Sequence, residues 1–186
     1  PIAVCDTGIE VALGTSGLAR VWTMSLDNGS FDNCGIPELA ARRVVDTISV
    51  GPVDSLVYSD WSDYVQFDCM DAGMEILAQL RTSDAAGNVS ICHARVTVVD
   101  RMAPWCGGLV DQTVACSSLP TDFLTTNVRQ LTEIFGAATA YDNCTAFAQE
   151  LLPETGTDVD GNCVITRRFT AVDASGNQAL QIFTQQ

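Results

Sequence analysis

The chain repeats one five-residue phrase towards the end of each half, and this repeat limits its fold more than any other feature. Asp-Ala-Ala-Gly-Asn occupies positions 84–88, and Asp-Ala-Ser-Gly-Asn occupies 173–177. Each copy follows an Asp-Asn-Cys triplet, at 32–34 and 142–144. The same motifs in the same order indicate tandem modules, and arrays of modules usually serve mechanical or display roles.

The spacing of the motifs sets the expected module boundaries. Cys69 follows Cys34 by 35 positions, whereas Cys163 follows Cys144 by only 19, so the first copy carries an insertion, expected near 46–66. We expect a first module over 1–99, a linker over 100–103 and a second module over 104–186. Each is close to the roughly 100 residues of an immunoglobulin-like domain. The start of the chain resembles residues 103–106, so we expect it to begin at a module junction within a longer protein.

The charge balance restricts the partners of the chain. It has 23 acidic residues against nine basic ones, all arginine, for a net charge of −14. Such a surface disfavours nucleic acid as a partner. It suits either a solvated acidic face or the binding of hard cations, and the sequence leaves both open. No apolar run reaches the ~18 residues that a membrane-spanning helix needs, so no membrane insertion is expected, and no signal peptide is recognisable.

The eight cysteines divide four and four between the modules, and none forms a Cys-x-x-Cys pair of the kind used for zinc or redox chemistry. We therefore expect disulfides and an oxidising compartment. Spacing alone does not fix the pairing, but Cys34–Cys69 and Cys144–Cys163 occupy matching places in the repeat. The cysteines that remain would then pair as Cys5–Cys92 and Cys106–Cys116.

The hydrophobic pattern predicts an all-β fold. Segments with period-two alternation or many β-branched residues, bounded by Gly, Asn and Asp, predict strands over 11–13, 20–26, 76–82, 91–99, 164–172 and 178–183. One helix is predicted over 122–135. Several short strands separated by turns indicate two tandem immunoglobulin-like antiparallel β-sandwich modules with disulfides. The repeated phrase then lies in the last hairpin of each module.

The motifs resemble repeats of large surface adhesins. Residues 27–35, 67–69, 84–92 and 96–100 are similar to repeats of Bacteroidota surface adhesins, including the gliding-motility adhesin type, and cover the whole first module. Residues 113–116, 141–144, 165–173 and 176–177 resemble the related hyalin-repeat type, with Ser175 where many relatives have Cys. The motifs are weak singly, but their repeated order is fairly specific.

This resemblance implies a non-catalytic module of a giant repetitive protein at the cell surface. Such proteins are exported by the type IX secretion system and serve in attachment or gliding motility. The expected partners are neighbouring modules of the same chain, like chains in a fibre, and a surface glycan or other cell-surface target.

The acidic motifs predict a calcium site. Immunoglobulin strand order would place the loops 27–35 and 84–88 at the leading pole of the first module, and the equivalent loops of the second module beside the linker. Carboxylate and amide oxygens from several loops are the ligands that Ca²⁺ prefers. We therefore expect Asp100, Asp142, Asp173 and Asn177 to form a site at the module junction. Asp27, Asp32, Asp84 and Asn88 would face an upstream module. The same residues also serve in turns without any metal.

The insertion suggests an alternative function, glycan binding. It carries Tyr58, Trp61 and Tyr64 among acidic residues, and exposed aromatic rings can stack on sugars or cover a sheet edge. Thr47 and Ser55 each follow an Asp and precede an apolar residue, which resembles the O-glycosylation sites of Bacteroidota.

Catalytic interpretations find little support in the sequence, and we expect no enzyme activity. His93 is the single histidine and has no recognisable partner for general-base chemistry. Glu150 and Glu154 could form a glycosidase pair, but nothing else indicates a cleft. The segment 158–162 begins like a calcium loop but lacks the later Glu of an EF-hand, so we interpret it as a hairpin turn.

Overall fold

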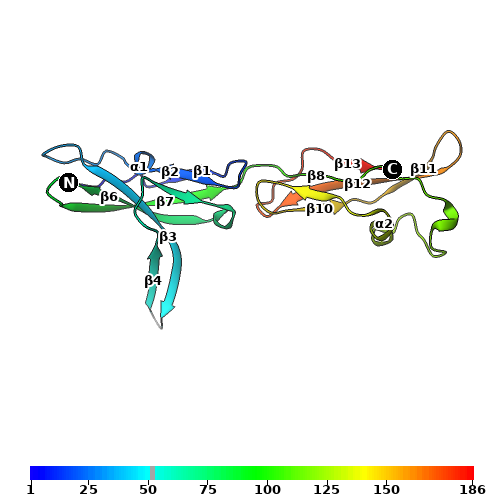
Figure 1. Cartoon of the computed structure of the whole chain (residues 1–186), viewed down its shortest axis with the longest axis horizontal. Coiled ribbons are helices and arrows are strands. Elements are labelled where there is room, and N and C mark those ends of the chain that lie inside the picture. The colour runs from blue at the N-terminus through cyan, green and yellow to red at the C-terminus, as the bar shows by residue number, and fades with distance from the viewer. Residues whose placement is uncertain (51–52) are drawn as a thin grey trace. The chain divides into compact units, whose positions relative to one another are not determined.

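The computed structural model describes residues 1–50 and 53–186, and residues 51 and 52 of the predicted insertion lie outside this part. The chain divides into two compact units, Pro1–Arg101 and Met102–Gln186. Strands are the main secondary structure of both units (Figure 1). The predicted linker, 100–103, spans this division. The described residues contain no helix long and apolar enough to cross a membrane.

The first unit consists of two sheets. Its seven strands and two short helical turns are β1 (Ile9–Ala12), β2 (Ala19–Trp22), α1 (Thr23–Leu26), β3 (Glu38–Val50), β4 (Val53–Tyr58), β5 (Tyr64–Phe67), η1 (Cys69–Asp71), β6 (Glu75–Ser83) and β7 (Val89–Val99). The larger sheet has the order β1-β7-β6-β3-β4, and the smaller pairs β2 with β5. All ladders are antiparallel except β1 with β7. This is the strand order of an immunoglobulin-like sandwich.

The core of the first unit lies between these sheets. Leu80 of β6 and Val96 and Val98 of β7 are fully buried, as is Phe67 of β5. Alternate residues of β7 point outwards because successive side chains of a strand lie on opposite faces. The strands predicted over 76–82 and 91–99 are confirmed as parts of β6 and β7.

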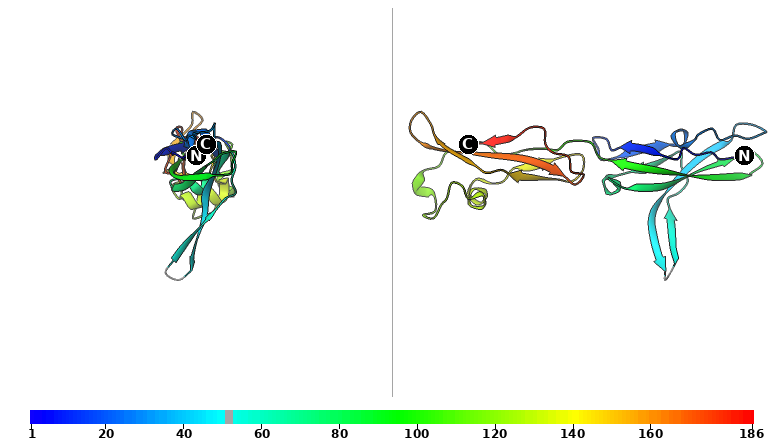
Figure 2. Two further views of the ribbon diagram at one scale, coloured as in Figure 1. Left: turned by 90° about the vertical axis from the view of Figure 1, so that its left-hand side faces the viewer. Right: turned by 180° about the vertical axis from the view of Figure 1, so that it is seen from behind.

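The insertion forms a long hairpin. Strand β3 pairs with β6 through residues 38–43 and then with β4 through residues 44–50. Its second half therefore leaves the sheet, and the hairpin of β3 and β4 projects from the rest of the unit in all views (Figures 1 and 2). Val45, Ile48 and Leu56 on this hairpin are exposed.

The second unit is a smaller assembly of strands. Its elements are β8 (Trp105–Gly107), η2 (Cys116–Ser118), α2 (Val128–Phe135), β9 (Thr139–Tyr141), β10 (Ala146–Glu150), β11 (Glu154–Thr157), β12 (Cys163–Asp173) and β13 (Phe183–Gln185). Strand β12 pairs with β11, β10 and β13, and β8 pairs with β9. The core cluster contains Cys106, Ala138, Phe169 and Ala171. The predicted all-β fold class with tandem antiparallel units is confirmed.

Three predicted elements were placed incorrectly. The strand over 20–26 ends at Trp22, because the Asp27 N–H bonds the Thr23 carbonyl and closes the helical turn α1. The strand predicted over 178–183 does not form as a whole, because residues 178–182 make only an isolated bridge, from Gln178 to Val172. The strand there is β13, which begins at Phe183. The helix over 122–135 begins at Val128, where the Asn127 side chain accepts the Gln130 N–H as a cap.

One predicted disulfide is present, and three are wrong. Cys5 bonds Cys92 with an S–S distance of 2.11 Å. Cys34, Cys106, Cys116 and Cys163 carry free thiols, so the predicted pairs Cys34–Cys69, Cys144–Cys163 and Cys106–Cys116 do not form. Cys69 and Cys144 are also disulfide-bonded.

Strand length explains two of these errors. Cys34 lies near the end of the sheet where Glu38 pairs with Ser83, whereas Cys69 precedes Gly73, which bonds Val98 at the other end. Cys163 begins β12, and Cys144 precedes β10, which pairs with the far end of β12. A strand of 11 residues separates its ends by about 33 Å, and a disulfide requires Cα atoms within ~7 Å.

The third error has a different cause. Cys106 packs in the core beside Phe169, whereas Cys116 is exposed on η2. Burial raises the pKa of the Cys106 thiol, so this side chain behaves as a small apolar group.

Candidate functional site

The repeated phrase forms a turn that its own side chains close. In the turn between β6 and β7, Asp84 Oδ1 accepts the N–H groups of Ala86 and Asn88 at 2.9 and 2.8 Å. Asp84 Oδ2 accepts the side-chain amide of Asn88 at 2.8 Å. This Asn88 hydrogen bond lowers the pKa of Asp84. Gly87 has φ of 84°, a conformation that favours glycine.

The same turn recurs twice in the second unit. Asn177 donates its backbone N–H and its side-chain amide to Asp173, at 2.8 and 2.7 Å. Asn162 makes the same two bonds to Asp158, both at 2.8 Å, in the turn between β11 and β12. The interpretation of 158–162 as a hairpin turn is therefore confirmed. Its Val159 differs from the alanine of the other copies, so sequence matching on the whole phrase missed the third copy.

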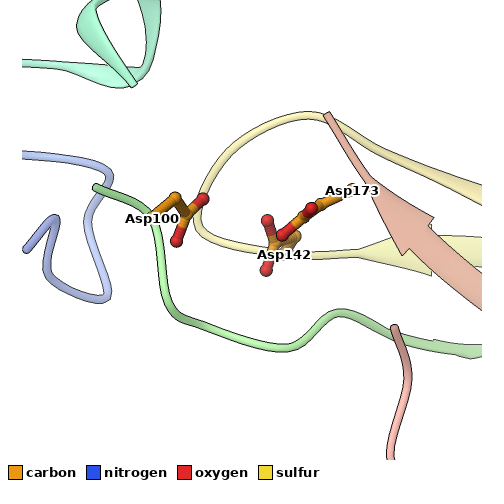
Figure 3. Close-up of side chains that lie close together, drawn as sticks. All are labelled: Asp100, Asp142 and Asp173. Carbon is orange, nitrogen blue, oxygen red and sulfur yellow. The ribbon is translucent and has the colours of Figure 1, made fainter. Parts of the chain in front are cut away.

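Three of the predicted calcium ligands lie together. Oxygen atoms of Asp100, Asp142 and Asp173 are all within 4.8 Å of one another (Figure 3). Asp142 precedes β10, Asp173 ends β12, and Asp100 lies on the chain segment just before Met102. Asp100 and Asp173 are 7% and 5% exposed, so little solvent screens their charges. Among the described residues, no other set of three or more Asp, Glu, His or Cys side chains has its potential ligand atoms this close together.

The donor set of this group fits calcium. Three carboxylates are hard oxygen ligands, and Ca²⁺ takes six to eight oxygens in a flexible geometry. A divalent cation would also offset the repulsion between carboxylates at this separation. Asn177, the fourth predicted ligand, donates its side-chain amide to Asp173 and so helps to position that carboxylate.

The four predicted ligands of the first unit are each engaged locally. Asp27 Oδ1 accepts the Ser30 N–H at 2.9 Å, and Asp32 pairs with the amino group of Pro1 at 2.9 Å. Asp84 and Asn88 bond each other, as described above. Asp32 and Asp84 share one end of the unit, and the negative charges of both raise the pKa of the Pro1 amino group. The structure does not bring these side chains into a group of metal-like spacing within the part it describes.

The aromatic residues of the insertion separate into two groups. Arg42 lies over both Tyr58 and Trp61, at 4.3 Å from each ring centroid. Tyr64 begins β5 in the smaller sheet, where it contacts Trp22 at 5.1 Å and lies beneath Arg20. Tyr58 and Trp61 therefore share Arg42, whereas the contacts of Tyr64 are with residues of β2.

Other predicted residues have clear structural positions. Thr47 and Ser55 are both exposed on the projecting hairpin, as a modification site requires. His93 Nε2 lies 2.9 Å from the Gln79 amide nitrogen on the outer face of the sheet. Glu150 pairs with buried Arg167 and Glu154 with Arg168, so each of the two carboxylates has its own arginine partner.

Sequence reasoning missed Arg42 and Arg81, which contact Trp61 from two strands. Both arginines were visible in the sequence. Their proximity depends on the register between β3 and β6, which pairs Ala40 with Arg81 and Arg42 with Gln79. Local pattern does not specify that register.

Comparisons with known proteins supply no family for this chain. No protein-family model matches it. No curated protein matches it at a significant level. One solved structure with a detectable similarity is the extracellular domain of protocadherin gammaB4, with 14% identity, a TM-score of 0.29 and coverage of 98% of this chain. The chain spans 33% of that protein's length, and a TM-score of this size does not establish a shared fold.

Proposed function

We propose that this chain is a non-catalytic structural and adhesive segment of a large repetitive protein at the cell surface, of the adhesin type that its motifs resemble. One observation carries the proposal: two successive all-β units place the same self-closed turn beside β12 and between β6 and β7. The Cys5–Cys92 disulfide suits an extracellular location, because such bonds persist in oxidising compartments.

A structural segment should resist force, and pulling on single molecules tests this role. We expect each unit to unfold in one cooperative step and to refold after relaxation. Cys5–Cys92 links residues 87 positions apart, so the chain between them stays closed under load. The double variant Cys5→Ser and Cys92→Ser should therefore give a longer extension when the first unit opens.

The control for this experiment is Cys34→Ser, which removes an exposed free thiol and should leave the extension unchanged. A gradual lengthening of the wild-type chain at low force, without cooperative steps, would contradict a load-bearing role.

Calcium binding is the second part of the proposal. Asp100, Asp142 and Asp173 would hold the ion, and Asn177 would keep the Asp173 carboxylate in place. The ion would supply charge compensation to these carboxylates and so stabilise the loops that carry them. The similar turn at Asp158 belongs to no group of three or more such side chains among the described residues, which makes it an internal comparison.

Thermal unfolding with and without calcium tests this site. At about 100 times its dissociation constant, a ligand adds roughly 2.7 kcal/mol to stability, so Tm should rise by several degrees. Asp142→Asn should abolish the rise, whereas Asp158→Asn should preserve it. Equal melting in calcium and in chelator, together with no bound metal in native mass spectrometry, would refute the site.

Neighbouring modules of the same chain and like chains in a fibre are the partners that we propose. Thr47 and Ser55 are proposed O-glycosylation sites, and additional mass on peptides that contain them would identify the modification. Glycan recognition is a second candidate function. Because Tyr58 and Trp61 both contact the Arg42 guanidinium, this grouping favours recognition of a charged sugar by arginine over stacking of a sugar on the rings.

A further inference from the structure

Two arginines share one tryptophan ring on the outer face of the larger sheet of the first unit. The guanidinium carbons of Arg42 and Arg81 lie 4.3 and 4.7 Å from the centroid of Trp61. Arg42 comes from β3 and Arg81 from β6, and the register places them on the same face. All three side chains are partly exposed. Cation–π contacts of this kind hold a guanidinium group in a fixed orientation.

These two arginines differ from most others in the chain because they lack an acidic partner. Six of the nine arginines form an ion pair with a carboxylate: Arg43, Arg95, Arg101, Arg129, Arg167 and Arg168. Within the described residues, neither Arg42 nor Arg81 has a carboxylate oxygen within 4.0 Å. Asp60 and Asp63 flank Trp61 in sequence, and Glu38 lies on the same sheet face, yet none of them pairs with either arginine.

Most hydrogen-bond donors of the two arginines have no acceptor among the described residues. Arg42 Nε donates to Gln79 Oε1 at 2.8 Å, and this is its one side-chain hydrogen bond there. Arg81 Nε is buried and has no acceptor. Two like charges on one ring repel each other, and an anion bound to both would offset this repulsion. Guanidinium groups bind carboxylates through two parallel N–H bonds, which gives strong and directional recognition.

Uncharged and titratable polar side chains lie beside this pair of arginines. The Gln79 amide nitrogen lies 3.3 Å from the Tyr58 hydroxyl and 2.9 Å from His93 Nε2. The Tyr58 hydroxyl and the His93 imidazole are groups that hydrogen-bond sugar hydroxyls, whereas the buried Gln79 amide is already engaged by its neighbours. An acidic peptide would satisfy the arginines equally well, but a uronic acid carries several hydroxyl groups on the same ring as its carboxylate, within reach of Tyr58 and His93. The combination favours an acidic saccharide.

We propose that Arg42, Trp61 and Arg81 form a binding site for the carboxylate of a uronic-acid saccharide. The two guanidinium groups bind the carboxylate, Tyr58 and His93 lie beside it to bind hydroxyl groups, and the buried Gln79 amide holds Arg42, Tyr58 and His93 in place. This inference stands independently of the structural role proposed above, because a load-bearing segment needs no ligand site.

Titration calorimetry with tetragalacturonate tests the proposal on the whole chain. The methyl-esterified tetrasaccharide, which lacks the charge, and a tetraglutamate peptide serve as comparison ligands. We expect binding of tetragalacturonate alone, weakened by salt. Arg42→Gln and Arg81→Gln should each lower the affinity about tenfold or more, because each removes charge-assisted hydrogen bonds.

Arg20→Gln is the matched control. Arg20 also lies over a ring, that of Tyr64 at 4.6 Å, and bonds a glutamine, Gln66, but it belongs to the smaller sheet. Its replacement should leave the affinity unchanged. In the wild-type chain, NMR should also show tetragalacturonate shifting the Trp61 indole N–H signal, and this readout requires no variant to fold.

Four outcomes would overturn the proposal. They are an absence of tetragalacturonate binding, equal binding of the methyl ester, an equal loss in the Arg20→Gln chain, and tighter binding of the tetraglutamate peptide. The last would identify the site as one for acidic peptides.

Discussion

At the scale of single residues, the carboxylate of the Asp-x-x-Gly-Asn turn has the same role in all three copies. Asp84, Asp158 and Asp173 each accept the backbone N–H and the side-chain amide of the asparagine four positions later. These bonds stabilise the ionised carboxylate. Self-closure therefore explains why the phrase recurs at Asp158 and at Asp84, where no acidic group of metal-like spacing forms among the described residues.

The pH dependence of Asp158 tests this role. Hydrogen bonding by Asn162 holds the pKa of Asp158 below the usual range. A group with a depressed folded-state pKa contributes stability that is present above its unfolded pKa and is lost as the pH falls through the folded value. NMR titration of the carboxyl carbon should therefore give a pKa below that of an unstructured aspartate, and Asn162→Ala should raise it. An unchanged pKa in the variant would contradict the explanation.

At the scale of elements, β12 organises the second unit through one buried arginine. Arg167 donates to Glu150 of β10 at 2.7 and 2.8 Å, to Gln185 of β13 at 2.8 Å and to the carbonyl of Gly136 at 2.9 Å. The side chains of Arg167 and Glu150 are only 3% and 6% exposed. The arginine therefore connects two strands with the end of α2.

Replacement of Arg167 should destabilise the second unit strongly. Arg167→Met leaves the Glu150 carboxylate buried without its cation, a change that typically costs about 3–5 kcal/mol. Urea unfolding followed through Trp105, the single tryptophan of this unit, measures the loss. Glu150→Leu in the same chain should restore much of the stability. Arg129→Met, which breaks an exposed pair with Glu133, should leave the stability almost unchanged. Equal losses in the two arginine variants would contradict the role of burial.

At the scale of the whole molecule, the division into two units follows from the repeat, whereas the cysteine chemistry does not. Matching the two copies led us to pair the cysteine of each Asp-Asn-Cys triplet with the next cysteine of the same copy. In the structure, Cys34 and Cys163 are free, because strands of up to 11 residues separate the members of those pairs. The one correct pair, Cys5–Cys92, joins the start of the first unit to its last strand.

The sequence alone was sufficient for features that depend on neighbouring residues. Alternation in 91–99 predicted the strand β7, and the spacing of Asp, Gly and Asn predicted the turns, since both follow from local backbone geometry. It also brought Asp100, Asp142 and Asp173 into one proposal, because repeated motifs imply repeated loop positions.

Only the tertiary structure decided which distant residues meet. The projecting hairpin, the burial of Arg167 and the shared ring of Arg42, Trp61 and Arg81 all depend on strand register and on where β3 leaves the sheet. A shift of one residue in register would move each side chain to the opposite face. Register is set by the packing of the whole core, so a local pattern of residues carries no record of it.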